Sequence, residues 1–365
     1  MKNIESIIDA VYQGKRLDTD AAETLYHNAP LLTLGSLANH LRYQKKPDPI
    51  VTFVVDRNIN YTNICVSRCK FCAFCRPVSH PDAYVISKSA LDQKIQETLD
   101  LGGTQILLQG GMHPDLSMDY YLDLIKHIKD RFDIHIHGFS PAEIAHMTNM
   151  SNQTYDQTID QLIQAGLDSI PGGGAEILVD AVRRHISPNK CDTNTWLKIM
   201  EIAHEKGLPT TATMMFGHIE TPSQMIAHLV RIRDLQDKTK GFTAFIPWSF
   251  QPDNTSVHIR KATAWQYLRV LALSRVILDN VENIQASWVT QGDKIGQLAL
   301  TFGANDLGST MIEENVVAAA GVKFRLSTND MVRLIQTAGF QAVQRNCVYE
   351  SKKVYESLNT NDFIR

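Results

Sequence analysis

Short apolar runs rich in β-branched residues alternate along this chain with longer runs in which apolar residues recur at helical spacing. The short runs predict strands at residues 50–55, 105–109, 134–138, 168–171, 210–216, 242–247 and 284–289, with a weaker one at 304–307. The longer runs predict helices at residues 90–101, 118–131, 154–165, 193–206, 222–237, 264–278 and 294–302. Strands that alternate with helices in this way are typical of parallel βαβ units.

Polar, glycine-rich segments follow almost every predicted strand. This favours a barrel over an open sheet, because a (β/α) barrel builds its active site from the loops that follow its strands. The predicted fold class is therefore α/β: a near-complete, eight-stranded, TIM-like barrel over residues 46–325. Residues 1–45 predict an N-terminal helical extension, and residues 326–365 predict a C-terminal helix and strand packed on the barrel.

Charge and hydropathy exclude several classes of protein. The 365 residues include 36 Lys and Arg against 39 Asp and Glu, a formal net charge of −3, which argues against a protein that coats nucleic acid or an anionic membrane. No apolar run approaches the ~20 residues that span a bilayer, and the N-terminus shows no signal or transit peptide. We therefore expect a cytoplasmic protein with neither nucleic acid nor membrane as a partner.

Four of the six cysteines fall within eleven residues, directly after the first predicted strand, and read C-x3-C-x2-C with one more beyond: Cys65, Cys69, Cys72 and Cys75. Clustered thiols in a cytosolic protein indicate a metal or redox chemistry. A structural zinc site usually takes two pairs of ligands separated by a longer loop, which this window lacks. Three thiolates at this spacing can hold three corners of a four-iron cube and leave the fourth iron open to chelate the amino and carboxylate groups of S-adenosylmethionine (SAM).

The segment NYTNICVSRCKFCAF resembles the cluster loop of radical-SAM enzymes, and most closely the group that makes menaquinone by the futalosine route and the deazaflavin FO. The resemblance implies a radical-SAM barrel with a [4Fe-4S] cluster on Cys65, Cys69 and Cys72, SAM as the second cofactor, and Phe71 among the cofactor contacts. Members of the group commonly carry Tyr in place of Cys75. A C-x2-C-x2-C set that begins at Cys69 remains an alternative; otherwise Cys75 is a nearby spare thiol.

Three loops after strands are similar to the SAM-binding loops of this family. The resemblance implies that the backbone of Gln109, Gly110 and Gly111 binds the methionine amino group, although a glycine pair after a strand also suits a plain turn. Glu176, which follows Gly172-Gly173-Gly174-Ala175, would hold SAM through its ribose or its amino group. The alternative for that segment, a phosphate cradle, lacks the Lys-Ser/Thr of a P-loop.

The third such loop contains Gly217 and Ile219 and resembles the segment that flanks adenine. It also fits a helix cap in which Glu220 lies near the positive end of a helix dipole.

Histidines and acids near strand ends are the candidates on the substrate side. His135 and His137 alternate with isoleucines and share one face of the third predicted strand; a core histidine is the alternative for both. His137 and Glu143 are the candidate catalytic bases. The candidate substrate-binding residues are Ser140, Trp248, Asp306 and Glu314, for which core packing or solvated acids are the alternatives.

Further segments resemble the cyclase of this group over residues 51–324: GGTQILLQGGMHPDL, LDSIPGGGAEIL, TTATMMFGHIETP, GFTAFIPWSFQP and GANDLGSTMIEENV. The resemblance implies a reaction in menaquinone biosynthesis that joins the ribose C4′ of dehypoxanthine futalosine to its benzoate ring by C4′ hydrogen abstraction, radical addition, and loss of an electron and a proton. Flavodoxin or ferredoxin is the expected electron donor. Aminofutalosine synthase, an FO synthase subunit, and a non-catalytic iron–sulfur or zinc protein remain alternatives.

Overall fold

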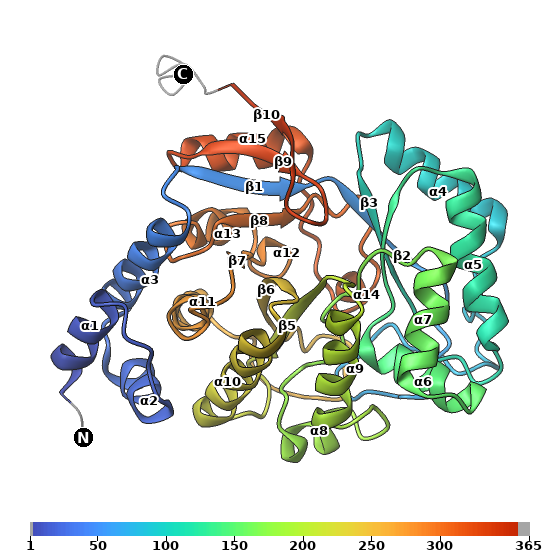
Figure 1. Cartoon of the computed structure of the whole chain (residues 1–365), viewed down its shortest axis with the longest axis horizontal. Helices are drawn as coiled ribbons and strands as arrows, with labels where there is room; N and C mark the ends of the chain where they lie inside the picture. Colours follow the sequence, from blue (N-terminus) through green and yellow to red (C-terminus); the bar gives the residue numbers. More distant parts are fainter. Residues whose placement is uncertain (1–2, 357–365) are drawn as a thin grey trace.

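The computed structural model describes residues 3–356 as a barrel of parallel strands surrounded by helices (Figure 1). Its strands are β1 (Ile50–Val54), β2 (Asp56–Asn60), β3 (Gln105–Gln109), β4 (His135–Gly138), β5 (Thr210–Phe216), β6 (Phe242–Ser249), β7 (Asn283–Ile284), β8 (Asp306–Ser309), β9 (Gln341–Arg345) and β10 (Ser351–Val354). Its helices are α1 (Ile4–Tyr12), α2 (Thr19–Asn28), α3 (Leu31–Lys45), α4 (Lys88–Asp100), α5 (Met118–Arg131), α6 (Pro141–Ser151), α7 (Tyr155–Ala165), α8 (Asp180–Ile186), α9 (Thr193–Glu205), α10 (Pro222–Thr239), α11 (Ala264–Ile277), α12 (Trp288–Gln291), α13 (Asp293–Ala299), α14 (Val316–Ala319) and α15 (Thr328–Thr337).

Parallel pairings close the barrel through the described residues. β2 pairs with β3, β3 with β4, β5 with β6, β6 with β7, and β1 with β8. Single parallel bridges join the remaining neighbours: His137 with Ser169, Ile170 with Thr210, and Gln285 with Asp306. We call each strand position around the barrel a stave. β1 and β2 together form one bent stave and residues 169–170 form another, so the ring has eight staves. The predicted α/β barrel is therefore confirmed.

The first stave is longer than the strand predicted at residues 50–55, because β2 continues β1 after Val55. Every residue of β2 is buried although its sequence is DRNIN. Polar residues alternate there because one face of the strand lines the barrel interior, where they meet a cavity instead of an apolar core. Apolar periodicity therefore missed this half of the stave.

The C-terminal segment enters the sheet itself. β9 pairs in parallel with β1, with Ile50 opposite Gln341, and β10 pairs with the outer edge of β9. The predicted domain boundary at residue 325 therefore cuts through one sheet, because β9, which follows the boundary, pairs with β1, which precedes it. Residues 4–45 form α1, α2 and α3, which lie beside the barrel along α11 (Figure 1).

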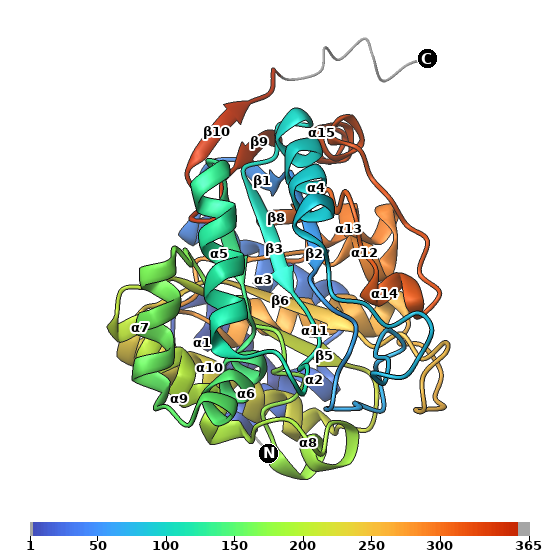
Figure 2. The same cartoon turned by 90° about the vertical axis from the view of Figure 1, so that its right-hand side faces the viewer.

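Helices cover the outside of the staves, with α4 and α5 in front of β2 and β3 in the side view (Figure 2). Two helices that the sequence analysis left out, α6 and α8, follow β4 and the fourth stave. No helix in residues 3–356 combines the length and the apolar character needed to cross a membrane.

Candidate functional site

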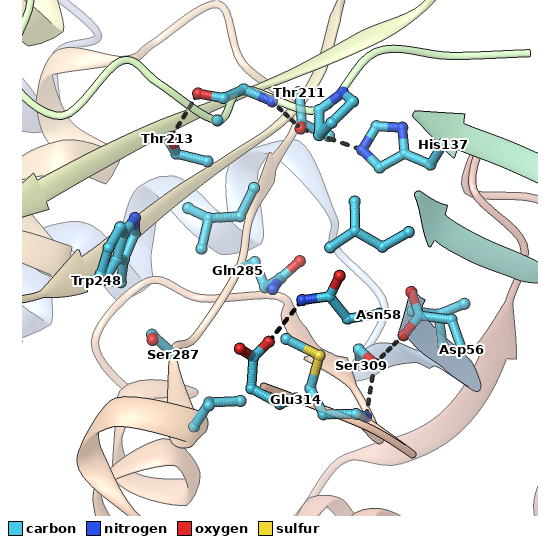
Figure 3. A pocket seen from close by; sticks show the side chains of 18 of the residues that line it. Asp56, Asn58, His137, Thr211, Thr213, Trp248, Gln285, Ser287, Ser309 and Glu314 are labelled. Carbon is cyan, nitrogen blue, oxygen red and sulfur yellow. Dashed lines mark hydrogen bonds between the residues drawn. The ribbon is translucent and has the colours of Figure 1, made fainter. Parts of the chain in front are cut away.

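A cavity of about 300 Å³ occupies the barrel interior and is lined from every stave (Figure 3). At the end where the strands finish, its wall includes Gly172, Glu176 and Glu314; at the opposite end it includes Asp56 and Arg345. The volume lies at the lower end of the range for small-molecule sites, ~300–1,000 Å³. The barrel therefore contains a ligand-sized chamber with polar groups at both ends.

The loop after β2 carries the three predicted cluster ligands, and hydrogen bonds reach two of their sulfurs. The Met112 N–H donates to Cys65 Sγ at 3.3 Å, and Ser67 Oγ lies 3.0 Å from Cys69 Sγ. The thiol of Cys75 and the Met112 N–H, opposed by burial, lower the pKa of Cys65 to about 5. Burial raises the pKa of Cys69 to about 11, so it is the amide and hydroxyl donors at the sulfurs that fit an iron–sulfur ligand set.

Cys75 lies beside Cys65, and its thiol donates to the Cys65 carbonyl at 3.3 Å. In the described part of the chain, no three His, Cys, Asp or Glu side chains converge on one metal ion. The ligands of a four-iron cube do not need such convergence, because each binds a different iron.

Gly111 lets the second loop approach the cluster loop backbone to backbone. Its N–H donates to the carbonyl of Thr62 at 2.9 Å, and a Cβ at this position would lie 2.1 Å from the carbonyl oxygen of Ile64. Gln109 lines the cavity, and the N–H of Gly110 donates to Glu143 at 2.9 Å. Because an ammonium group only donates hydrogen bonds, the carbonyl oxygens of this loop are the groups suited to it.

Glu176 pairs with two cations, one of which, Lys190, reaches the cluster loop. Its carboxylate pairs with Lys190 at 2.8 Å and with Arg183 at 3.5 Å, and the Lys190 ammonium lies 5.1 Å from the centroid of the Phe71 ring. Glu176 also adopts a left-handed φ of 42°. Such strain in a non-glycine residue tends to occur at functional sites.

The Gly217 loop lies outside the cavity lining. The N–H groups of Gly217 and His218 donate to the Glu220 carboxylate, and Ile219 is 39% exposed. Glu220 therefore holds the turn before α10, whereas the cap of that helix is Thr221, whose hydroxyl accepts from the Gln224 N–H.

The two candidate bases have different surroundings. His137 lines the cavity, with Nδ1 2.6 Å from Ser169 Oγ and Nε2 3.5 Å from Thr211 Oγ1 (Figure 3). Burial, helped by the charges of His135 and Arg345, lowers the pKa of His137 to about 3, so the ring is neutral.

Glu143 lies outside the cavity lining and is fully engaged. It accepts from Tyr61 Oη at 2.8 Å, the Gly110 N–H at 2.9 Å, and the N–H and hydroxyl of Ser140 at 2.7 and 2.6 Å. Ser140 and Glu143 form the capping box of α6. Glu143 therefore holds the Gly110 loop in place, and of the two candidate bases His137 is the one that faces the chamber.

The predicted substrate contacts also separate. Trp248 and Glu314 line the cavity, and Glu314 accepts from Asn58 Nδ2 at 2.9 Å (Figure 3). Asp306 does not line it: its carboxylate accepts from Arg345 at 2.5 and 3.0 Å. The sequence analysis placed Asp306 at the end of the eighth strand, which is wrong, because β8 begins there.

Sequence reasoning missed several polar lining residues: Asp56, Asn58, Gln105, Thr211, Thr213, Gln285, Ser287, Ser309 and Arg345. The alternation of Asp56, Asn58 and Asn60 was a signal for the first two, since period two is that of a strand. Arg345 had no such signal, because it reaches the chamber from a strand near the end of the chain.

Comparison with known proteins identifies the family. The model of the radical SAM superfamily matches residues 59–232, and that of the CofH/MqnC C-terminal region matches residues 239–358. Cyclic dehypoxanthine futalosine synthase of Halalkalibacterium halodurans is 45% identical over 99% of this chain and 99% of its own, and that of Streptomyces coelicolor is 43% identical over 97% and 90%. The 5-amino-6-(D-ribitylamino)uracil–L-tyrosine 4-hydroxyphenyl transferase of Methanopyrus kandleri is 42% identical over 84% and 85%.

Solved structures show the same fold at low identity. The hydrogenase maturase HydG from Carboxydothermus hydrogenoformans superposes with a TM-score of 0.73 at 18% identity, covering 95% of this chain and 80% of that one. Methylornithine synthase (PylB) gives 0.72 at 17%, covering 98% of both chains. Radical SAM enzymes use a [4Fe-4S] cluster and SAM, and the donor set described above fits them. This chain therefore belongs to the radical SAM superfamily, in the family that contains the cyclic dehypoxanthine futalosine synthases.

Proposed function

We propose that the protein converts dehypoxanthine futalosine to its cyclic form, as a radical-SAM step of menaquinone biosynthesis. The observation that carries this proposal is 45% identity over 99% of the chain to a protein of that name. A chamber of about 300 Å³, whose wall includes Gln109 and Glu176 from the two loops that contact the cluster loop, supports it, because radical chemistry needs a substrate held close to SAM and shielded from water.

Residues at the C-terminal ends of the staves would hold the cofactors. Cys65, Cys69 and Cys72 would bind the cluster, which together with SAM supplies a 5′-deoxyadenosyl radical when both are bound. The carbonyls of the Gln109–Gly111 loop would accept hydrogen bonds from the methionine ammonium. Glu176 would contact the ribose or the amino group.

Phe71 and the Gly217–Ile219 segment are further proposed contacts to SAM. Phe71 borders the cluster loop beside Lys190, and the Gly217–Ile219 segment would flank adenine from above the cavity.

Arg345 is the lining residue suited to the benzoate carboxylate. Within the described residues, it is the one Arg or Lys in the cavity wall. Its hydrogen bonds to Asp306 and to the Asn346 carbonyl use three of the five N–H donors of a guanidinium, which leaves two for a ligand. The benzoate end of the substrate would thus lie toward the floor of the chamber.

The opposite part of the wall suits the ribose. Asn58 and Glu314, already hydrogen-bonded to each other, present amide and carboxylate groups to hydroxyls, and the Trp248 ring offers an apolar face. With the ribose there, C4′ faces the end of the chamber where SAM binds, and His137 faces the arene as the base.

A reductant such as flavodoxin or ferredoxin would feed electrons to the cluster, and a cytoplasmic location is part of the same proposal, because thiolate ligands persist in a reducing compartment.

An anaerobic assay of the reconstituted protein tests the function. With SAM, a reductant and dehypoxanthine futalosine, we expect a product two hydrogens lighter than the substrate together with free 5′-deoxyadenosine. Incorporation of the adenosyl group into product would indicate aminofutalosine synthase instead. The 42% identity to the tyrosine-dependent transferase justifies a parallel assay with 5-amino-6-(D-ribitylamino)uracil and tyrosine; turnover only in that assay would overturn the proposal.

A further inference from the structure

A chain of hydrogen bonds runs from the wall of the chamber to the partly exposed surface at the N-terminal end of the barrel. His137 lines the chamber, and its Nδ1 lies 2.6 Å from Ser169 Oγ. The same Ser169 oxygen lies 2.7 Å from Nε2 of His135, which is partly exposed. The bridge between His137 and Ser169 in neighbouring staves fixes this arrangement in the backbone.

The three hydrogen-bond partners of the Ser169 hydroxyl allow a proton to pass from His137 to His135. A serine hydroxyl donates one hydrogen bond and accepts two. If His137 Nδ1 and the Cys347 thiol, 3.4 Å away, donate to Ser169, its own proton is directed at His135 Nε2. In that orientation Nε2 of His137 carries no proton and faces the chamber.

The cyclisation proposed above creates a proton that must leave this chamber. When the substrate radical has added to the arene, the ring regains aromaticity by losing one electron, taken up by an oxidised iron–sulfur centre, and one proton. We infer that His137, Ser169 and His135 form the exit path for this proton. This inference rests on the proposed function.

The transfer balances without any further reactant. His137 Nε2 takes the aryl proton while the Nδ1 proton moves to Ser169 Oγ. The Ser169 proton moves to Nε2 of His135, and the Nδ1 proton of His135 leaves to a buffer base. His137 thus contacts the substrate, whereas Ser169 and His135 act through it.

Charged groups around the path favour a passing imidazolium at its outer end. Burial lowers the pKa of His135; the charge of Asp168 partly offsets this, and Lys129, paired with Asp168 at 2.6 Å, adds to it. Arg345 faces the inner ring, His137, and disfavours a charge there. Asp168 therefore favours a passing positive charge on the outer ring, and Arg345 disfavours one on the inner ring.

The chamber's carboxylates offer a poorer exit. Asp56 is bonded to Ser309 and to Gln105, and both of these partners are buried. Glu314 accepts from Asn58 and from the N–H groups of Val316 and Val317. Glu176, also in the wall, is paired with Lys190, a cation that cannot accept a proton, whereas the hydrogen bonds of His137 continue through groups that both donate and accept.

Two variants interrupt the path, and a third controls for them. Ser169→Ala removes the central hydroxyl, and His135→Gln removes the outer ring. His204→Gln is the matched control, because His204 also lies between two hydroxyls, those of Thr239 at 2.6 Å and Thr210 at 2.7 Å, but does not line the chamber.

The assay follows cyclic product and 5′-deoxyadenosine in H₂O and D₂O with the reconstituted enzyme. We expect Ser169→Ala and His135→Gln to form cyclic product at least about tenfold more slowly, since positioned proton transfer typically contributes ~10²–10⁴-fold. The ratio of 5′-deoxyadenosine to product should rise, and so should the solvent isotope effect on product formation. His204→Gln should match the wild type, and added imidazole should restore product formation in His135→Ala.

A second measurement does not depend on activity. In ¹⁵N spectra of the histidine rings without substrate, Ser169→Ala should shift the His135 and His137 signals and leave His204 unchanged. Ser169→Thr, which keeps the hydroxyl, should retain product formation if Ser169→Ala loses its fold.

The outcomes are distinguishable. Wild-type product ratios and isotope effects in both Ser169→Ala and His135→Gln, or unshifted ¹⁵N signals in Ser169→Ala, overturn the exit path. If the wild type itself makes no cyclic product from dehypoxanthine futalosine, the proposed function fails instead, and the ¹⁵N spectra still decide whether the hydrogen-bonded path exists.

Discussion

The chemistry available to each residue depends on how many protein partners it already has. Glu143 and Asp306 are acids near strand ends, yet Glu143 accepts from four donors and Asp306 forms a bidentate pair with Arg345. The sequence contained a warning for Glu143, because Ser140-x-x-Glu143 is the pattern of a capping box. It contained none for Asp306, whose partner lies on a distant strand.

The cysteines permit a direct test of the ligand set. Alanine at Cys65, Cys69 or Cys72 should each abolish the four-iron cluster, because each removes one of three corners, whereas Cys75→Ala should retain it. Iron and sulfide analysis with electron paramagnetic resonance of the reconstituted proteins measures this. A cluster that survives in Cys65→Ala and disappears in Cys75→Ala would assign the C-x2-C-x2-C set instead.

Arg345 can be tested by changing the shape of the cation. Arg345→Lys keeps the charge but cannot pair with Asp306 through two parallel bonds and still reach a ligand. We expect KM for dehypoxanthine futalosine to rise about tenfold or more, with a smaller change in kcat. Unchanged KM in a folded Arg345→Lys enzyme would remove Arg345 from the substrate site.

Buried histidines should make stability depend on pH. Burial, together with Arg183 and Arg231, lowers the pKa of His228 to about 3, so the ring stays neutral in the fold but takes up a proton in the unfolded chain below about pH 6.5. Stability is therefore lost as the pH falls from about 6.5 toward 3, by up to about 1.4 kcal/mol per pH unit for each such histidine.

Urea unfolding at pH 6 and pH 5 under anaerobic conditions measures this loss. The difference between the two pH values should be about 1 kcal/mol smaller in His228→Gln than in the wild type. An equal difference in both proteins would show that His228 is already protonated in the fold.

At the scale of elements, continuous apolar runs located the barrel strands correctly, and a run interrupted by polar residues was assigned wrongly. β3, β5 and β6 lie where the apolar runs predicted them. The strand predicted at residues 284–289 overlaps β7 only at Ile284, and α12 begins at Trp288. An apolar run alone does not distinguish a strand from the buried first turn of a helix.

Two loops meet at Gly111, and a methyl group there should separate them. Gly111→Ala would place Cβ 2.1 Å from the Ile64 carbonyl oxygen and 2.9 Å from Cys65 Cβ, so backbone has to move. We expect a lower cluster content and at least tenfold slower SAM cleavage, measured as 5′-deoxyadenosine.

Gly339→Ala is the control for that variant. Its Cβ meets no atom within 4 Å, and only the left-handed backbone, with a φ of 88°, costs about 1–2 kcal/mol. Equal cluster content in the two variants would mean that the backbone around Gly111 can move enough to accept a methyl group.

For the whole molecule, the order of the barrel strands could be predicted from the sequence, but the closure of the N-terminal end of the barrel by β9 and Arg345 could not. Local apolar runs and glycines record the order of strands along the chain. The pairing of β9 with β1 joins segments from opposite ends of the chain and leaves no local pattern. For the same reason the analysis found the cysteine loop but missed Arg345.

Removal of β9 should therefore affect the whole protein. A chain that ends at residue 340 leaves Asp306 buried without its guanidinium partner, which costs about 3–5 kcal/mol in comparable cases. We expect this shorter chain to show no cooperative thermal unfolding transition near the melting temperature of the wild type. Circular dichroism measures this. A chain that ends at residue 356 is the control and should unfold like the full chain; an unchanged transition in the shorter chain would contradict the role of β9.

Because Arg345 belongs to the last strand but one, the ribosome delivers the base of the reaction chamber after every other wall. A nascent chain exposes its cysteine loop and its glycine-rich turns while the underside is still missing. A premature stop codon anywhere before residue 345 should therefore act as a null allele, even though the four clustered cysteines have already been translated.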